Sequence, residues 1–140
     1  EATAGMRVEA GHGYLAPGGF HMTVAHHGLH TTIGLNEEPP ENSCRPAVDV
    51  LFRTAAKAFN GRVLAVVMTG IGYDGLLGTR DVVAAGGQAL AQDQATSVVW
   101  GMPRAIAEAG LADAVLPLGK LGSEITARIQ PRVFASAGRG

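Results

Sequence analysis

The sequence predicts an α/β fold, namely a doubly wound, mostly parallel sheet with an antiparallel β-hairpin extension. Three observations predict it. A buried-type strand at 63–68 runs directly into a glycine loop at 70–75. Strand and helix patterns alternate along the rest of the chain, as they do where parallel strands are joined by helical crossovers. The first third instead shows short strand patterns separated by glycine and proline, which is typical of antiparallel hairpins.

The expected hairpin region contains three strand patterns, at 13–16, 20–25 and 30–35. Turn residues at 17–19 and at Gly28 separate them. The expected strands are therefore short and antiparallel.

The segment 36–45 is polar, carries prolines and has neither helical nor strand periodicity, so it is predicted to be a loop. Pro46 suits the first position of a helix, and apolar residues follow at helical spacing until Asn60 and Gly61 end it. Beyond this helix the expected elements are strand 63–68, helix 75–85, strand 88–92, a short helix near 95–99, helix 103–109, strand 113–116 and helix 121–130.

Length and composition argue against several classes of protein, including nucleic-acid-binding and membrane-spanning proteins. The 140 residues fit one domain, here 1–130 followed by a loose tail at 131–140. A net charge of −1 without a basic stripe argues against nucleic acid as a partner, and no apolar run approaches the ~20 residues of a membrane span. Cys44 is the single cysteine, which fits a reducing, cytoplasmic location. The chain begins at Glu1, and its first methionine is Met6, so we expect a piece of a longer protein.

The glycine loop 70–75 matches the G-x-G-x-x-G pattern of dinucleotide-binding folds, and Asp93 follows at the distance of a ribose-binding acid. Against this hypothesis, Asp74 would place a negative charge where a pyrophosphate needs bare N–H groups. We therefore expect no nucleotide and no other cofactor.

Asp74 itself has two interpretations. It can cap the helix that follows it, as many aspartates do. Alternatively, it stands at the carboxyl end of a central parallel strand, where α/β sheets place their sites and where a carboxylate can orient a histidine. The residues alone leave both interpretations open.

Four motifs, in one order along the chain, resemble the catalytic domain of the bacterial chemotaxis protein-glutamate methylesterases of the CheB type. They are Leu15-Ala16-Pro17-Gly18-Gly19-Phe20-His21-Met22, Arg45-Pro46-Ala47-Val48-Asp49-Val50-Leu51-Phe52, Thr69-Gly70-Ile71-Gly72-Tyr73-Asp74-Gly75 and Ala91-Gln92-Asp93-Gln94-Ala95-Thr96-Ser97-Val98-Val99-Trp100-Gly101-Met102-Pro103.

The resemblance implies an activity and its partners. In that family a Ser-His-Asp triad hydrolyses glutamyl γ-methyl esters on chemoreceptors, and related enzymes deamidate receptor glutamines. Asp74 falls on the triad aspartate, while Ile71 and Gly72 fall where the backbone borders the oxyanion site. The resemblance also suggests methyl-accepting chemoreceptors as partners and an N-terminal response-regulator receiver domain in the parent protein.

Two family motifs are absent from the sequence. No serine stands in a G-x-S-x-G-G context, and no glutamine precedes a histidine. We therefore expect the chain to be the C-terminal part of the domain and to be inactive alone. The alternative is a non-catalytic module that binds receptors or a regulatory domain.

Four of the five histidines lie between His21 and His30, which raises the possibility of a zinc site. Strand alternation would send His26 to the opposite face from His21 and His27, so no metal is expected. His21 and Met102 belong to matched motifs and are predicted at the rim of a substrate site.

Overall fold

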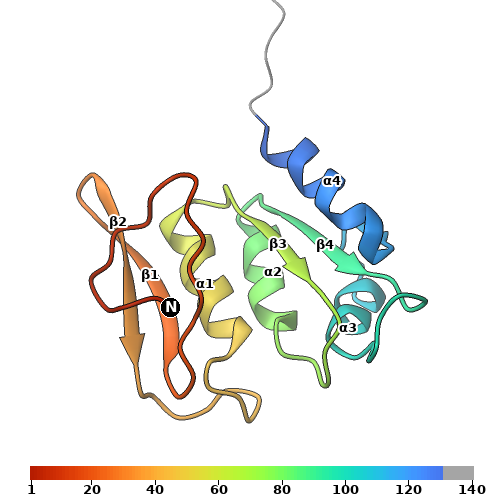
Figure 1. Cartoon of the computed structure of the whole chain (residues 1–140), viewed down its shortest axis with the longest axis horizontal. Helices are drawn as coiled ribbons and strands as arrows, with labels where there is room; N and C mark the ends of the chain where they lie inside the picture. The colour runs from red at the N-terminus through yellow and green to blue at the C-terminus, as the bar shows by residue number, and fades with distance from the viewer. Residues whose placement is uncertain (131–140) are drawn as a thin grey trace, which may run out of the picture.

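The computed structural model describes residues 1–130, and the predicted tail at 131–140 lies outside the described residues. Figure 1 shows a hairpin beside a helix-covered parallel sheet. In chain order the elements are β1 His21–His27, β2 His30–Asn36, α1 Val48–Ala58, β3 Leu64–Val67, α2 Leu76–Ala84, β4 Gln88–Gln92, α3 Met102–Glu108, β5 Ala114–Leu116 and α4 Leu118–Ile129.

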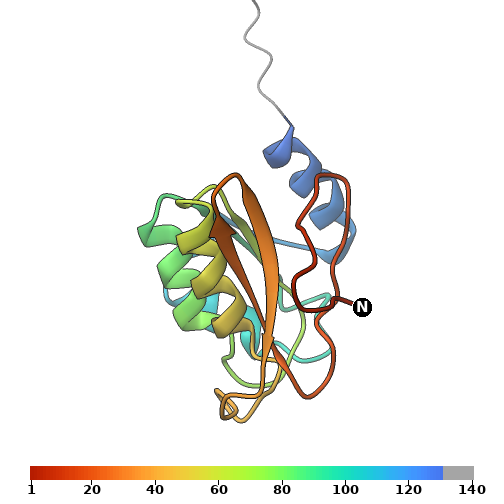
Figure 2. The ribbon, with the colours of Figure 1, turned by 90° about the vertical axis from the view of Figure 1, so that its left-hand side faces the viewer.

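The parallel sheet has the strand order β3-β4-β5. Leu64 pairs with Gln88 and Leu90 pairs with Ala114, so the carboxyl ends of all three strands lie at the same edge. Helices α2 and α3 connect successive strands. In Figure 2, α1 and α2 lie on one side of the strands, and α4 and the N-terminal segment lie on the other side. The α/β class, with a parallel sheet and an antiparallel hairpin, is confirmed.

The hairpin consists of β1 and β2, which pair antiparallel from His21–Asn36 to His27–His30 and pack on α1. The predicted strand at 13–16 is wrong, because these residues are irregular. The outer edge of β2 is instead covered by the N-terminal segment, where Gly5 N–H and Val8 N–H donate to the Ile33 and Thr31 carbonyls.

Several other elements differ from prediction; α4, for example, begins at Leu118 and not at 121. The helix expected near 95–99 is a turn, because the Asp93 carboxylate accepts hydrogen bonds from the Thr96 N–H and hydroxyl at 3.0 and 2.6 Å. Such local side-chain bonds compete with helical ones. Helix α1 begins at Val48 and not at Pro46, since Ala47 has the extended backbone of an N-cap.

Apolar side chains from these layers form three buried clusters. One joins α1 and α2 to β3 and β4, another joins the hairpin to the N-terminal segment, and the third lies between the sheet and α3. Val82, Leu90 and Ile106 are fully buried. The packed core thus fixes the ends of β3 and β4 relative to α1 and α2.

Helices α1 and α2 approach closely at Gly78. A Cβ atom there would lie 2.6 Å from Phe52 Cβ and 3.0 Å from Asp49 Cα. We expect Gly78→Ala to lower the free energy of unfolding by about 1–2 kcal/mol, because the crossing must open to admit a methyl group. Urea denaturation measures this change.

Gly122→Ala is the matched control, since a Cβ atom at this position of α4 meets nothing within 4 Å. It should leave stability unchanged or raise it, because alanine favours helix over glycine. Equal effects of the two substitutions would contradict the close approach at Gly78.

Candidate active-site aspartate and its supports

The glycine loop follows β3 at the carboxyl edge of the sheet, and the segment 99–102 holds it there. Gly70 N–H donates to the Val99 carbonyl at 2.9 Å, and the Gly70 carbonyl accepts from the Gly101 and Met102 N–H groups at 3.1 and 2.9 Å. A Cβ at Gly101 would lie 2.7 Å from the Gly70 oxygen. Only glycine at 101 permits this contact.

Gln92 fixes the start of the same loop from the end of β4. Its side chain is 1% exposed, accepts from the Thr69 N–H at 2.8 Å and donates to the Thr96 carbonyl at 2.8 Å. The Trp100 indole N–H donates to the Gln92 carbonyl at 3.0 Å. These internal bonds give the Gln92 side chain a structural role in holding the loop.

Asp74 is 6% exposed and accepts three hydrogen bonds from outside its own loop. Val48 N–H donates to Oδ2 at 2.6 Å, while Asp49 N–H and the Asn42 amide each donate to Oδ1 at 3.0 Å. Helix α2 has Gly75, with φ of 95°, as its N-cap and no side-chain capping bond. The interpretation of Asp74 as the cap of α2 is therefore wrong, because its carboxylate lies at the N-terminus of α1.

Asp49 makes the reciprocal contact. It lies in the first turn of α1, is 1% exposed, and its Oδ1 accepts the Gly78 N–H of α2 at 2.7 Å. The N-terminus of α1 thus receives the Asp74 carboxylate from the loop before α2, and the N-terminus of α2 receives the Asp49 carboxylate from α1. Free N–H groups and the helix dipole favour negative charge at both places. Among residues 1–130, neither carboxylate forms an ion pair.

Asn42 joins the two carboxylates. Its Nδ2 donates to Asp49 Oδ2 at 2.8 Å and to Asp74 Oδ1 at 3.0 Å. Asn42 and Ser43 both have positive φ, 53° and 61°, between the mutually hydrogen-bonded residues Glu41 and Cys44, as in a type I′ turn. The sequence analysis did not single out Asn42, because asparagine in a polar loop gives no signal beyond a turn.

Side chains on either side hold this turn in place. The Arg53 guanidinium of α1 donates to both Glu41 oxygens at 3.0 and 2.8 Å, and Arg45 donates to two loop carbonyls. His21 is 1% exposed, with Nε2 3.0 Å from the Pro39 oxygen and Nδ1 3.3 Å from the Ala47 nitrogen. This placement does not support the prediction of His21 at a substrate rim, because both ring nitrogens are occupied inside the fold.

The Glu41–Arg53 ion pair makes the stability of this turn depend on pH. The hydrogen bond from Arg53 lowers the pKa of the Glu41 carboxyl from its ordinary value. The stabilisation is therefore present above the unfolded pKa of about 4.3 and is lost as pH falls through the lowered folded pKa. Because the pair is partly exposed, we expect Glu41→Gln to cost less than about 1 kcal/mol at pH 7.

Denaturation midpoints at pH 7 and pH 3 measure this contribution. The denaturation midpoint of Glu41→Gln should be lower than that of the wild type at pH 7, and this difference should shrink at pH 3. Glu37→Gln serves as a control, because only the backbone oxygen of Glu37 contacts Arg45. A difference that grows on acidification would contradict the sign of the pKa shift.

The remaining predicted site residues lie around the loop. Ile71 is 82% exposed, and Gly72 has φ of 83°. Neither N–H donates to an acceptor within residues 1–130. Met102 is partly buried, and its Sδ would lie 2.5 Å from a Cβ at Gly70, so its thioether supports the underside of the loop.

The dinucleotide alternative finds no support in this geometry. The Gly78 N–H, in the first turn of α2, already donates to Asp49. The buried carboxylates of Asp49 and Asp74 also lie where a pyrophosphate would approach. Asp93, the expected ribose ligand, is engaged by Thr96.

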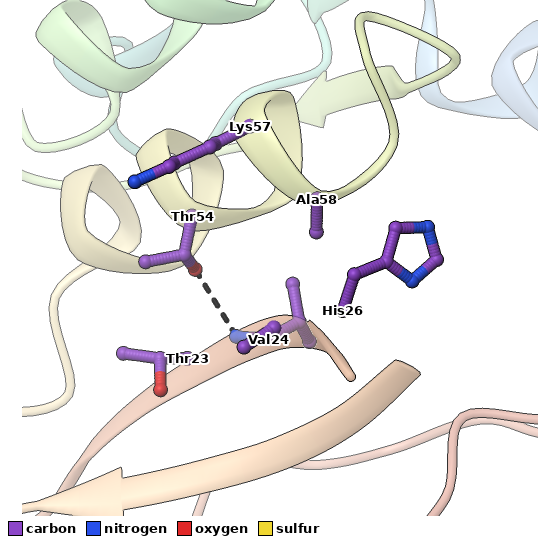
Figure 3. A pocket seen from close by; sticks show the side chains of 7 residues that line it. Thr23, Val24, His26, Thr54, Lys57 and Ala58 are labelled. Atoms are coloured by element: carbon purple, nitrogen blue, oxygen red, sulfur yellow. Dashed lines mark hydrogen bonds between the residues drawn. The ribbon is translucent and has the colours of Figure 1, made fainter. Parts of the chain in front are cut away.

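A separate cavity of about 450 Å³ lies between β1 and α1 (Figure 3). Thr23, His26 and Lys57 line it, and Thr54 closes one side by accepting the Val24 N–H at 3.2 Å. Its lining residues include neither Asp74 nor any of the residues that donate hydrogen bonds to Asp74. Within residues 1–130 no three metal-ligating side chains come together, and none of the helices there has the length and apolarity to cross a membrane.

Comparison with known proteins gives one consistent result. The family model for CheB methylesterase matches residues 1–125. A protein-glutamate methylesterase/protein-glutamine glutaminase of Trichodesmium erythraeum is 53% identical over 87% of the chain, and one from Rhodopseudomonas palustris is 52% identical over 96%. The chain spans about a third of the length of these relatives, 35% and 33%.

A solved structure agrees. The CheB methylesterase catalytic domain of Thermotoga maritima superposes with a TM-score of 0.90 at 36% identity, covering 92% of this chain and 68% of that one. The family match over residues 1–125 and the shared fold show that the chain belongs to the CheB methylesterase family.

Proposed function

We propose that this chain is the C-terminal part of a cytoplasmic enzyme that hydrolyses glutamyl γ-methyl esters on chemoreceptors and deamidates receptor glutamines, and that Asp74 is its triad aspartate. The single observation that carries the proposal is the Asp74 carboxylate. It is buried at the carboxyl edge of the sheet and is held by two helix N–H groups and one amide. A carboxylate fixed in this way can orient and stabilise an imidazolium.

In the proposed reaction, a serine outside this chain attacks the ester carbonyl, and a histidine accepts the serine proton. Asp74 holds the histidine in the required tautomer and stabilises its positive charge. The histidine then protonates the departing methanol, and water releases the glutamate from the acyl-enzyme.

The N–H groups of Ile71 and Gly72 are the proposed oxyanion donors. Both belong to the loop that presents Asp74, and both lack an acceptor within residues 1–130. A backbone donor is indifferent to the side chain at position 71, so isoleucine is compatible with this role. Met102 supports the loop from below and so shapes the same site.

The serine and histidine are proposed to come from strands that precede this chain. Strand β3 pairs with β4 alone among the described strands, so its other edge can receive a parallel neighbour. The solved catalytic domain is longer than the matched part, which leaves room for such strands. A receiver domain in the remaining length of the parent protein is part of the proposal.

A hybrid enzyme tests the function. In it, this chain replaces the matching third of the Trichodesmium erythraeum relative, and methanol release from methylated chemoreceptor is measured. We expect the hybrid to release methanol and the chain alone to release none. A folded hybrid that binds receptor without releasing methanol would favour the non-catalytic module and overturn the proposal.

A further inference from the structure

We propose that Asn42 is a positioning residue for the esterase reaction, which directs one particular oxygen of Asp74 toward the catalytic imidazole. The proposal rests on the proposed function of Asp74 and extends it to a residue in another part of the chain. Asn42 touches neither the ester nor the imidazole; it acts through the carboxylate.

The hydrogen bonds to Asp74 are unequal. Oδ1 accepts two, from the Asp49 N–H and the Asn42 amide, both at 3.0 Å. Oδ2 accepts one, from the Val48 N–H. Because a carboxylate oxygen has two lone pairs, Oδ1 is saturated and Oδ2 has one acceptor position left. The imidazole N–H is therefore expected to donate to Oδ2.

Asn42 is suited to this task by its chemistry. A neutral amide with two N–H groups can donate to two carboxylates at once, as Nδ2 does to Asp49 and Asp74. Aspartate in its place would add a third carboxylate to a buried group of charges, and a shorter hydroxyl has only one proton to donate. The amide thereby couples the position of Asp74 to the reciprocal capping of α1 and α2.

Asn42 is also rigidly placed. Its backbone lies in the left-handed region, which asparagine tolerates better than most residues. Glu41 before it is bound to Arg53 on α1, and Cys44 after it closes the turn through paired backbone bonds. A side chain on such a turn loses little entropy when it binds, so it can hold Asp74 in one orientation.

The test uses two substitutions within the same turn. Asn42→Gly removes the amide and keeps a residue that accepts positive φ, so the turn persists. Ser43→Gly is the matched control, because Ser43 has the same backbone conformation and an exposed side chain. In the hybrid enzyme, Asn42→Gly should lower kcat roughly 10-fold or more with KM changed less than about twofold, since misorientation affects the transition state more than binding. Ser43→Gly should leave both constants within about twofold.

A merely structural role would not give this result. If Asn42→Gly keeps kcat within about twofold while Asp74→Asn abolishes turnover, the positioning role is overturned and the function of Asp74 stands. If Asp74→Asn also keeps full turnover, the proposed function fails first.

A second measurement is independent of activity. In the isotopically labelled 140-residue chain, Asn42→Gly should move the backbone amide resonances of Val48 and Asp49, because both donate to the carboxylate that Asn42 holds. Ser43→Gly should leave these resonances in place. Unchanged resonances in the Asn42→Gly chain would show that the amide does not position Asp74 and would overturn the proposal.

Discussion

Asp74→Asn in the hybrid enzyme is expected to lower kcat about 10⁴-fold, the loss typical of an orienting aspartate in a Ser-His-Asp triad. Asparagine keeps the shape of the side chain but presents an amide where the imidazole N–H requires an acceptor. The wrong tautomer and the loss of the negative charge both disfavour the imidazolium. KM should change little, because Asp74 is buried and, in the proposed triad, contacts the histidine and not the ester.

Asp81→Asn is the control for this measurement, since Asp81 is an exposed acid on α2. It should retain full turnover. Circular dichroism and a denaturation midpoint must show that the Asp74→Asn hybrid is folded. A folded Asp74→Asn hybrid that loses less than about tenfold in kcat would contradict the assignment of Asp74 to the triad.

Asp49→Ala has the largest effect expected on stability, a loss of about 2–3 kcal/mol. The substitution removes the acceptor of the Gly78 N–H and one of the two partners of the Asn42 amide. Because this site is buried, the Gly78 N–H is left without its acceptor, while the Asn42 amide keeps only its bond to Asp74. The favourable interaction of the carboxylate with the N-terminal dipole of α1 is lost as well.

Urea denaturation of the 140-residue chain measures this loss, with Asp81→Ala as the exposed counterpart. Asp49→Asn should be intermediate, because its oxygen can still accept the Gly78 N–H while its amide faces the amide of Asn42. A stability of Asp49→Ala equal to that of Asp81→Ala would contradict reciprocal capping as a source of stability.

The sequence predicts the parallel sheet well because its signals are local. Apolar strands between glycine turns and helices with a clear apolar face appear within windows of ten residues, and β4 was predicted over its observed range. The predictions for the segments near 13–16 and 95–99 were wrong because the conformation there depends on contacts that these patterns do not show. At 95–99 a side-chain bond between Asp93 and Thr96 decides the conformation. The segment 13–16 is irregular and, within residues 1–130, has one backbone hydrogen bond, from the Ala2 N–H to the Leu15 carbonyl, in place of a strand ladder.

The site was predictable only in part. Asp74 is marked by its place after a buried strand, but its partners Asn42, Val48 and Asp49 lie 25 to 32 residues earlier. A helix capped by a carboxylate from a distant loop leaves no pattern in either segment. His21 is a second example. Its motif alone suggests a substrate contact, whereas in the fold its ring nitrogens lie beside Pro39 and Ala47, near the two ends of the loop before α1.

The most direct test of the central claim is a crystal structure of the hybrid enzyme at a resolution that places the Asp74 carboxylate. It should show the Nδ1 atom of a histidine from the preceding segment within about 2.6–3.2 Å of Asp74 Oδ2, with the Val48 and Asn42 bonds retained. A histidine that lies beyond hydrogen-bond reach of Asp74, or that is bound by another carboxylate, would contradict the assignment of Asp74 as the orienting acid.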